Sequence, residues 1–314
     1  MGRETRAIPA VSVVIPAFNY GRFVTEAVDS VLAQTMAPRE IIVVDDGSTD
    51  DTRQRLSRYA SRVKYVYQTN QGLSAARNTG IRQAASDWIA FLDADDLWHP
   101  EKLDAEFGAV SGLDGIRFFG SARAAEWPAQ VPHDARARRL GVRDFLCWMP
   151  LSGSSAVVHR SCFDEIGGFD EGLRSVEDRD MWLRLVVRYP SAAVEAGCWW
   201  YREHPQQMNR NAARMHQNYV RVLTRFFRDH PQPRSLERLG WSFLFYDASY
   251  SHFAEGDRRA AAIFLVRSLW RCPRAFSGGP SRRRARLKLG IRLALGERIW
   301  ARRPGGRRST GSGT

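Results

Sequence analysis

Three carboxylates, Asp93, Asp95 and Asp96, stand within four residues and directly follow the apolar run 88–92. In an open α/β sheet, ligands bind beyond the carboxyl ends of the strands. Carboxylates this close repel one another, and a hard divalent cation such as Mg²⁺ or Mn²⁺ relieves the repulsion. Turn chemistry alone does not require three of them at one strand exit. The spacing therefore predicts a metal site at Asp93 and Asp95.

The segment 16–19, after the first apolar run, reads Pro-Ala-Phe-Asn and lacks a glycine-rich phosphate loop. Dinucleotide-binding folds and P-loop NTPases place such a loop there, and nucleotidyltransferases carry a glycine-rich basic one. The sequence disfavours all three classes. We expect the charge of a bound diphosphate to be neutralised by the metal and by a cation such as Arg77.

Strand and helix patterns alternate along the first hundred residues. The predicted elements, alternately strand and helix, are 11–15, 24–32, 41–44, 50–59, 63–67, 73–85 and 88–92. This alternation predicts a mostly parallel sheet with right-handed crossovers. It also places the acidic residues at the carboxyl ends of the strands.

The pattern after residue 100 is less regular. The sequence predicts strands at 154–159 and 192–201, on either side of a helix at 178–189, whereas 101–152 carries no readable pattern. Helical periodicity takes over from Asn211 and includes a helix pair joined at Gly256-Asp257.

The formal net charge of +13 is concentrated at the carboxyl end of the chain. Residues 271–314 hold 13 Lys and Arg against one acid, Glu297, and the rest of the chain is nearly neutral. The segment 282–300 interleaves apolar residues with arginines and ends at Trp300. It forms either an amphipathic helix on an anionic membrane or a solvated, partly disordered end. We do not expect nucleic acid as a partner, because no reader motif accompanies the charge.

Cysteine usage and hydropathy favour a cytoplasmic protein. The four cysteines form no CxxC pair, which suits reduced thiols. No apolar run reaches the ~18 residues that span a bilayer, and the charged start 1–9 lacks the apolar core of a secretory leader. The protein is expected at the inner face of the cell membrane if 282–300 binds lipid.

Four segments together resemble the nucleotide-binding half of family 2 glycosyltransferases. They are VSVVIPAFN (11–19), IIVVDDGSTDDT (41–52), GLSAARNTG (72–80) and WIAFLDADDLWHP (88–100), in the family's order and spacing. The stretch 153–185, with GSSAVVHRSCFDEIGGFDE and VEDRDMWLRL, resembles the family's acceptor half. The resemblance implies the GT-A fold, an α/β architecture whose Rossmann-like central sheet is flanked by helices, and inverting sugar transfer. It fades after Arg210.

The resemblance implies a role for each matching residue of the donor site. Asp46 would accept a hydrogen bond from a uracil edge, and Arg77 would contact the nucleotide. The base pocket would be lined by Pro16, Ala17 and Phe18.

Asp93-Ala94-Asp95 matches the family's DxD motif. Asp95 would hold the Mn²⁺ or Mg²⁺ that bridges the diphosphate, and Asp93 would reach the ribose and the metal. His204 loosely matches a tract in which a histidine approaches the metal in some members, and a surface histidine is the alternative.

Asp178 matches the catalytic base of the family, and Glu177 before it belongs to the substrate site. Asp178 opens a predicted helix, where the positive dipole end would keep the carboxylate ionised. The alternative is that this pair only caps the helix.

These assignments predict a metal-dependent inverting glycosyltransferase that uses a nucleotide-sugar, UDP-linked by the resemblance. The expected acceptor is a hydroxyl of a saccharide or a lipid-linked oligosaccharide in surface polysaccharide or glycoconjugate synthesis. A catalytically silent nucleotide-sugar-binding or scaffold protein is the alternative.

The expected organisation has four parts. Residues 1–10 are an extension, and 11–210 form the GT-A domain, divided into a nucleotide-binding half (11–100) and an acceptor half (101–210). Residues 211–275 form a helical appendage, and 276–314 form a basic, partly disordered tail.

Overall fold

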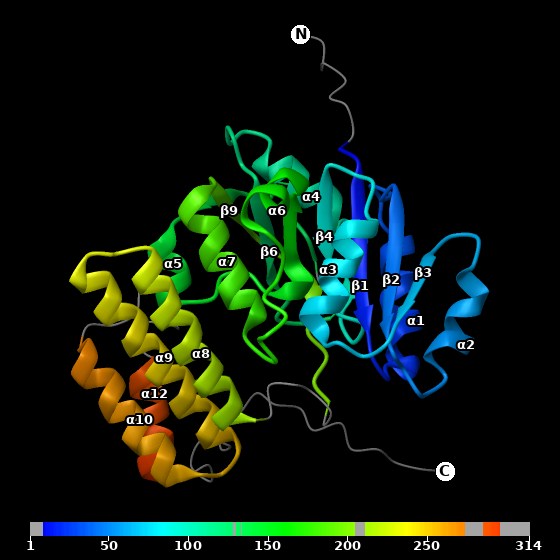
Figure 1. Ribbon diagram of the computed structural model, residues 1–314. Coiled ribbons are helices and arrows are strands. Elements are labelled where there is room, and N and C mark those ends of the chain that lie inside the picture. The colour runs from blue at the N-terminus through cyan, green and yellow to red at the C-terminus, as the bar shows by residue number, and fades with distance from the viewer. Residues whose placement is uncertain (1–8, 128–129, 133, 205–210, 274–284, 296–314) are drawn as a thin grey trace.

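The computed structural model describes residues 9–127, 130–132, 134–204, 211–273 and 285–295. Within these residues a central sheet is flanked by helices, and a group of helices packs at one end (Figure 1). The strands are β1 (Val11–Ala17), β2 (Glu40–Asp46), β3 (Lys64–Gln68), β4 (Trp88–Phe91), β5 (Leu97–Trp98), β6 (Phe118–Arg123), β7 (Ala137–Leu140), β8 (Ala156–His159) and β9 (Ser191–Trp200).

The helices cover both faces of this sheet. They are α1 (Gly21–Leu32), α2 (Thr52–Leu56), α3 (Leu73–Gln83), α4 (Lys102–Val110), α5 (Val142–Cys147), α6 (Arg160–Ile166), α7 (Glu177–Arg188), α8 (Ala212–Asp229), α9 (Arg234–Ala254), α10 (Arg258–Arg271) and α12 (Ala285–Leu295). Two 3₁₀ turns, η1 (Ser57–Tyr59) and η2 (Gly153–Ser155), complete the described elements.

The strand order is β3-β2-β1-β4-β8-β6-β9-β5, and β7 also pairs with β9. The predicted parallel arrangement holds for β3, β2, β1 and β4. Beyond β4 the sheet is mixed, because β8 runs antiparallel to both β4 and β6 and β9 runs antiparallel to β5 and β7. The mixed half comes from the stretch in which the sequence pattern is irregular.

Successive side chains of the strands enter two separate cores, as the period of two along a strand requires. Val13 and Ile15 pack toward α1 and α2, whereas Val14 packs toward α3 and α7. Gly80 of α3 permits this second contact, because a Cβ there would lie 2.2 Å from Val14 Cγ1. Close packing on both faces fixes where β1, β2 and β4 end.

The helices α8 and α9 contribute to the core next to α7. Tyr219, Leu223 and Phe226 of α8 and Phe243 of α9 are buried in the same cluster as Trp182 of α7. Trp182 is fully buried, and the centroid of its ring lies 4.8 Å from that of Phe118. Packing in the core is therefore its role.

The basic end of the chain includes a docked helix. In α12, Leu289 and Arg286 are buried, and Arg286 donates to the carbonyl oxygens of Ser268 and Cys272 at the end of α10. The other residues of 276–314 lie outside the described ones, as do 1–8. No helix among the described residues is long and apolar enough to cross a membrane.

Candidate active site

The carboxyl ends of β1, β2 and β4 open onto a cavity of about 710 Å³. Of the residues predicted from sequence, nine line it: Pro16, Ala17, Phe18, Asp46, Arg77, Asp93, Asp95, Glu177 and Asp178. The tenth, His204, lies against Asp95. Register explains the convergence, because Val14 of β1 pairs with Phe91 of β4, so the chain reaches Asp93 beside the end of β1.

One wall of the cavity is formed by the residues that follow β1 and β2. Phe18 is 45% exposed, so its ring is available to a ligand. Asn19 has a left-handed backbone (φ 57°), and its Oδ1 accepts hydrogen bonds from Thr49 N and Asp50 N. Asp50 accepts hydrogen bonds from Thr52 N at the start of α2 and from Gly21 N at the start of α1. These bonds join the two loops.

Asp46 lines the cavity and also holds its rim. Its oxygens accept from Gln68 Nε2 at 2.7 Å, Gln71 N at 2.9 Å and Gly72 N at 2.8 Å. Gly72 has φ 96°, and a Cβ there would lie 2.3 Å from Arg174 Nη1. A carboxylate has about four acceptor sites, so one direction of Asp46 is left for a ligand.

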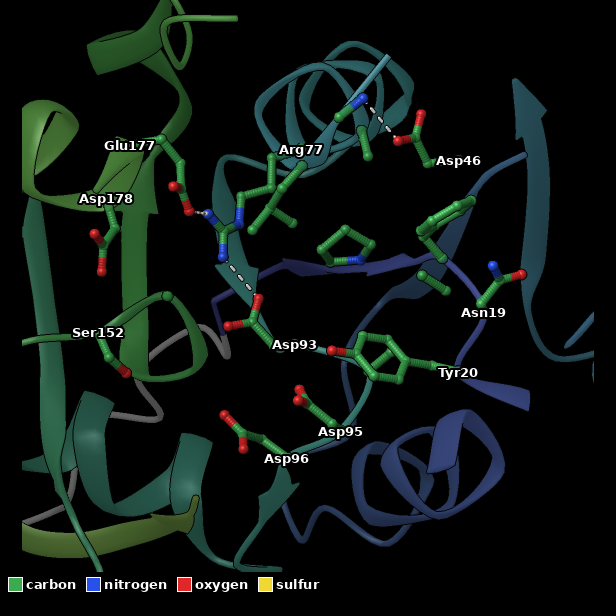
Figure 2. Close-up of a pocket in the computed structure, with 18 of the residues that line it drawn as sticks. Asn19, Tyr20, Asp46, Arg77, Asp93, Asp95, Asp96, Ser152, Glu177 and Asp178 are labelled. Atoms are coloured by element: carbon green, nitrogen blue, oxygen red, sulfur yellow. Dashed lines mark hydrogen bonds and ion pairs between the residues drawn. The ribbon is translucent and has the colours of Figure 1, made fainter. Parts of the chain in front are cut away.

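The acidic cluster after β4 gathers against one tyrosine. Figure 2 shows Tyr20 reaching toward Asp93 and Asp95, with Asp96 alongside. Burial raises the pKa of Tyr20, and the nearby charges of Asp95 and Asp93 add to that rise. The pKa of Asp96 is also raised, by burial first and then by Asp95. Three carboxylates and a phenol are therefore crowded together on this floor of the cavity.

Asp95 and His204 are of residue types that commonly bind metal ions, and their side chains lie against each other. His204 Nε2 lies 2.8 Å from Asp95 Oδ2, and both residues are buried. Burial and the charge of Asp93 raise the pKa of Asp95, whereas His204 opposes that rise. Among the described residues, no group of three or more His, Cys, Asp or Glu side chains could hold a metal ion.

The turn η2 holds the acidic floor in place. Ser154 Oγ accepts from Asp93 N at 3.2 Å and donates to Asp96 Oδ2, and Trp98 Nε1 donates to the carbonyl oxygen of Ser154 at 2.7 Å. Beneath Trp98, Lys102 donates to the Ser155 carbonyl oxygen at 3.2 Å and forms a fully buried ion pair with Glu106. No motif or periodicity in the sequence predicts this support.

Arg77 joins the two halves of the cavity. Its Nη2 donates to Asp93 Oδ1 and its Nη1 to Glu177 Oε1, both at 2.7 Å (Figure 2). The guanidinium is 1% exposed and lies over the ring of Phe169. Gly153 makes room for it, because a Cβ at that position would lie 2.5 Å from Arg77 Nη2. The buried positive charge of Arg77 is therefore compensated by a carboxylate on each side.

Asp178 stands in the first turn of α7, two residues after Val176, whose backbone is strained. Val176 is buried with φ 56°, a backbone conformation that β-branched residues rarely adopt. Burial raises the pKa of Asp178 to about 6, and the charge of Glu177 adds to the rise, against Arg179 and Arg77. The position at the helix start is the predicted one, but the environment outweighs the helix dipole that would favour ionisation.

The sequence and the fold are both those of known glycosyltransferases. One family model, Glycosyl transferase family 2, matches residues 12–111, and a second, Glycosyltransferase like family 2, matches residues 127–242. The chain belongs to glycosyltransferase family 2.

Relatives in this family share part of their length with the chain. A Rickettsia typhi protein named as an uncharacterised glycosyltransferase is 30% identical over 187 residues, or 57% of this chain and 59% of that protein. Chondroitin synthase of Escherichia coli is 38% identical over 200 residues, or 62% of this chain and 29% of the synthase. The chain thus spans less than two thirds of the length of these relatives.

Solved structures show the same GT-A fold. S. aureus TarS 1–349 in complex with UDP-GlcNAc has a TM-score of 0.62 and 18% identity, covering 91% of this chain and 87% of that one. A mannosyltransferase of Pyrobaculum calidifontis, in complex with GDP-Man and Mn²⁺, has a TM-score of 0.62 and 21% identity, covering 94% and 84%.

Several residues of this cavity were not predicted from the sequence. They are Asn19, Tyr20, Asn70, Ser152, Gly153, Val176, Arg214 and Met215. Tyr20 directly follows the motif 11–19, so its position gave a signal. Arg214 and Met215 come from α8, whose approach to the cavity depends on long-range packing that no local pattern encodes.

Proposed function

We propose that the protein is a metal-dependent inverting glycosyltransferase that moves a sugar from a nucleotide-sugar to a hydroxyl acceptor. One observation carries the proposal: Asp178 faces the same cavity as Asp93 and Asp95, and Arg77 links the two sides. Family membership supports the reaction class. The alternative, a silent binding protein, has no observation in its favour, because the acidic residues of both sides are present.

The donor would lie along the exits of β1, β2 and β4. The ring of Phe18 and the free direction of Asp46 suit a planar base with hydrogen-bond donors, such as uracil. TarS is solved with UDP-GlcNAc and the Pyrobaculum enzyme with GDP-Man, which supports a nucleotide-sugar in this position. We propose UDP as the nucleotide.

A divalent cation fits the donor set at the acidic floor. Asp95 offers carboxylate oxygen and His204 an imidazole nitrogen, ligands that Mn²⁺ accepts, and Asp93 lies beside them. Two or three protein donors suffice, because such cations usually take further oxygens from substrate phosphates. A cation held there would act as a Lewis acid and offset the charge on the departing diphosphate. The Mn²⁺ in the structure of the Pyrobaculum enzyme supports this assignment.

Asp178 would act as the base on the acceptor side. Its carboxylate accepts the proton of the acceptor hydroxyl while that oxygen bonds to the anomeric carbon and the bond to the diphosphate breaks, which inverts the configuration. A pKa of about 6 makes it a stronger base than an ordinary aspartate and leaves it mostly ionised at pH 7. Glu177 is held by Arg77 and therefore positions α7.

The acceptor is proposed to be a hydroxyl of a saccharide or of a lipid-linked oligosaccharide. Trp199, Tyr201 and Met215 line the cavity together with Asp178 and offer the apolar surfaces on which sugar rings pack. A lipid-linked acceptor is in keeping with the predicted contact of 282–300 with an anionic membrane.

Two variants separate the proposed roles in one experiment. Asp178→Asn should lower transfer by about 10²–10⁴-fold, the usual worth of a general base, and leave UDP binding unchanged. Asp95→Ala should instead lose Mn²⁺-dependent UDP binding. Turnover with a panel of nucleotide-sugars and calorimetry with UDP and Mn²⁺ measure the two effects, and Asp114→Asn, at an exposed position on another surface, is the matched control. Normal turnover in Asp178→Asn would remove that residue from the role.

A further inference from the structure

The outer face of α10 exposes a row of large apolar side chains. Ile263 is 46% exposed, Val266 65%, Leu269 42% and Trp270 76%. The spacing of 263, 266 and 270 places these side chains on one face of the helix. The opposite face, with Leu265, packs inward. α10 therefore presents to solvent an apolar face of the kind that usually packs into a protein core.

α12 extends the apolar surface at the same end of the molecule. It packs against α10 and α9 through Leu289 and Arg286, and it leaves Leu287 63% exposed and Ile291 37% exposed. Figure 1 shows α10 and α12 together at the end of the molecule away from β1, β2 and β3. Both helices thus carry outward apolar residues that folding of the described chain does not use.

The charges on these two helices all have one sign. Neither 258–271 nor 285–295 contains an Asp or Glu. The basic residues are Arg258, Arg259, Arg267, Arg271, Arg286, Lys288 and Arg292. Arg271 lies over the ring of Trp270 at 5.6 Å, so a cation and an indole stand together at the end of α10.

We propose that the outer face of α10, with the adjoining face of α12, docks on an anionic lipid bilayer. Apolar side chains that enter the interface, cations beside them and a tryptophan at the boundary are the features that hold a helix in the plane of a charged membrane. The sequence left 282–300 as either a membrane-bound helix or a solvated end, and the exposed apolar face of α10 now adds an argument for membrane contact. The proposal concerns where the protein binds and does not rest on the proposed donor or acceptor.

Vesicle co-sedimentation of the full chain tests the proposal. Binding is measured with vesicles of phosphatidylcholine plus phosphatidylglycerol and with phosphatidylcholine alone, at low and high salt. The wild type should bind only the anionic vesicles and release in high salt. Val266→Asp and Trp270→Ala should each weaken binding at least tenfold, whereas Tyr67→Ala, an exposed aromatic on β3, should not.

Three outcomes overturn the proposal. They are absence of binding by the wild type, equal binding by Val266→Asp, and a dimer in solution that Val266→Asp dissociates, since the face would then join two copies. Circular dichroism confirms folding of each variant. Nucleotide-sugar turnover is measured in parallel, and a protein that binds vesicles without turnover contradicts only the proposed function.

Discussion

Glu177 and Asp178 are neighbours in the chain, yet the fold gives them different surroundings. Glu177 lies 2.7 Å from the guanidinium of Arg77, so its charge is compensated. The carboxylate of Asp178 accepts a hydrogen bond from the backbone N of Arg179. Burial and the charge of Glu177 raise the pKa of Asp178. Both residues follow Val176, whose left-handed backbone stands at the start of α7. One carboxylate is thus bound to a guanidinium, and the other is available to a proton.

The pH dependence of transfer should report Asp178. Its pKa is raised to about 6, and only the ionised form accepts a proton, so activity is lost as the pH falls through this value. We expect kcat/KM to be level above pH 7 and to fall about tenfold for each unit below pH 6. The measurement is initial rate against pH, with UDP binding followed in parallel. An acid limb near pH 4 would show that Asp178 titrates as an ordinary carboxylate.

At the scale of elements, the η2 turn matters more than its three residues suggest. Ser154 fixes Asp93 and Asp96, and Gly153 allows the turn to lie against Arg77. Trp98 and Lys102 hold the same turn from below. The acidic floor is therefore built by a segment far from it in sequence.

Gly153→Ala should destabilise the protein and impair donor binding. The added Cβ would lie 2.5 Å from Arg77 Nη2, and this buried guanidinium is fixed by two carboxylates, so overpacking should cost about 1–3 kcal/mol. Gly108→Ala on α4 is the matched control, because nothing lies within 4 Å of its Cβ, and it should stabilise the helix by about 0.5–1 kcal/mol. Urea unfolding measures both, and equal free energies of unfolding would contradict this account.

The sequence predicted β1 to β4 and the helices between them to within a few residues, since β-branched runs and apolar spacing there agree with the fold. Its motifs also pointed to Asp93, Asp95 and Asp178, which the structure brings to one cavity. It did not predict β6, β7, α4 or α5 in the stretch 101–152, because their contacts are with strands distant in sequence. The burial of the Lys102–Glu106 pair depends on tertiary packing, which no local pattern encodes.

On the scale of the whole molecule, the described residues form a sheet with two cores, one of which is completed by helices α8 and α9. α8 and α9 close the core beside α7, and Arg225 of α8 forms ion pairs with Asp170 and Asp180. Arg179 of α7 pairs with Asp247 of α9 and lies over the ring of Tyr219. These helices pack as part of the fold that positions Asp178.

Leu223→Ala should measure this contribution. Leu223 of α8 is fully buried in the core that α8 shares with α7. Its truncation should therefore cost about 2–5 kcal/mol of unfolding free energy. Leu287→Ala, the same change at a residue that is 63% exposed, should cost less than about 0.5 kcal/mol. Thermal unfolding compares the two. Similar losses would mean that α8 is not integral to the core.

The link through Arg77 limits how such enzymes can be recombined. A hybrid that joined the first hundred residues of this chain to a foreign C-terminal portion would inherit the guanidinium and keep Asp93. The new portion would have to supply a carboxylate at the place of Glu177. Without it, the buried guanidinium of Arg77 would lose one of its two ion-pair partners, at a cost of about 3–5 kcal/mol of stability. Exchange of acceptor preference between family members therefore has to carry this acidic residue along.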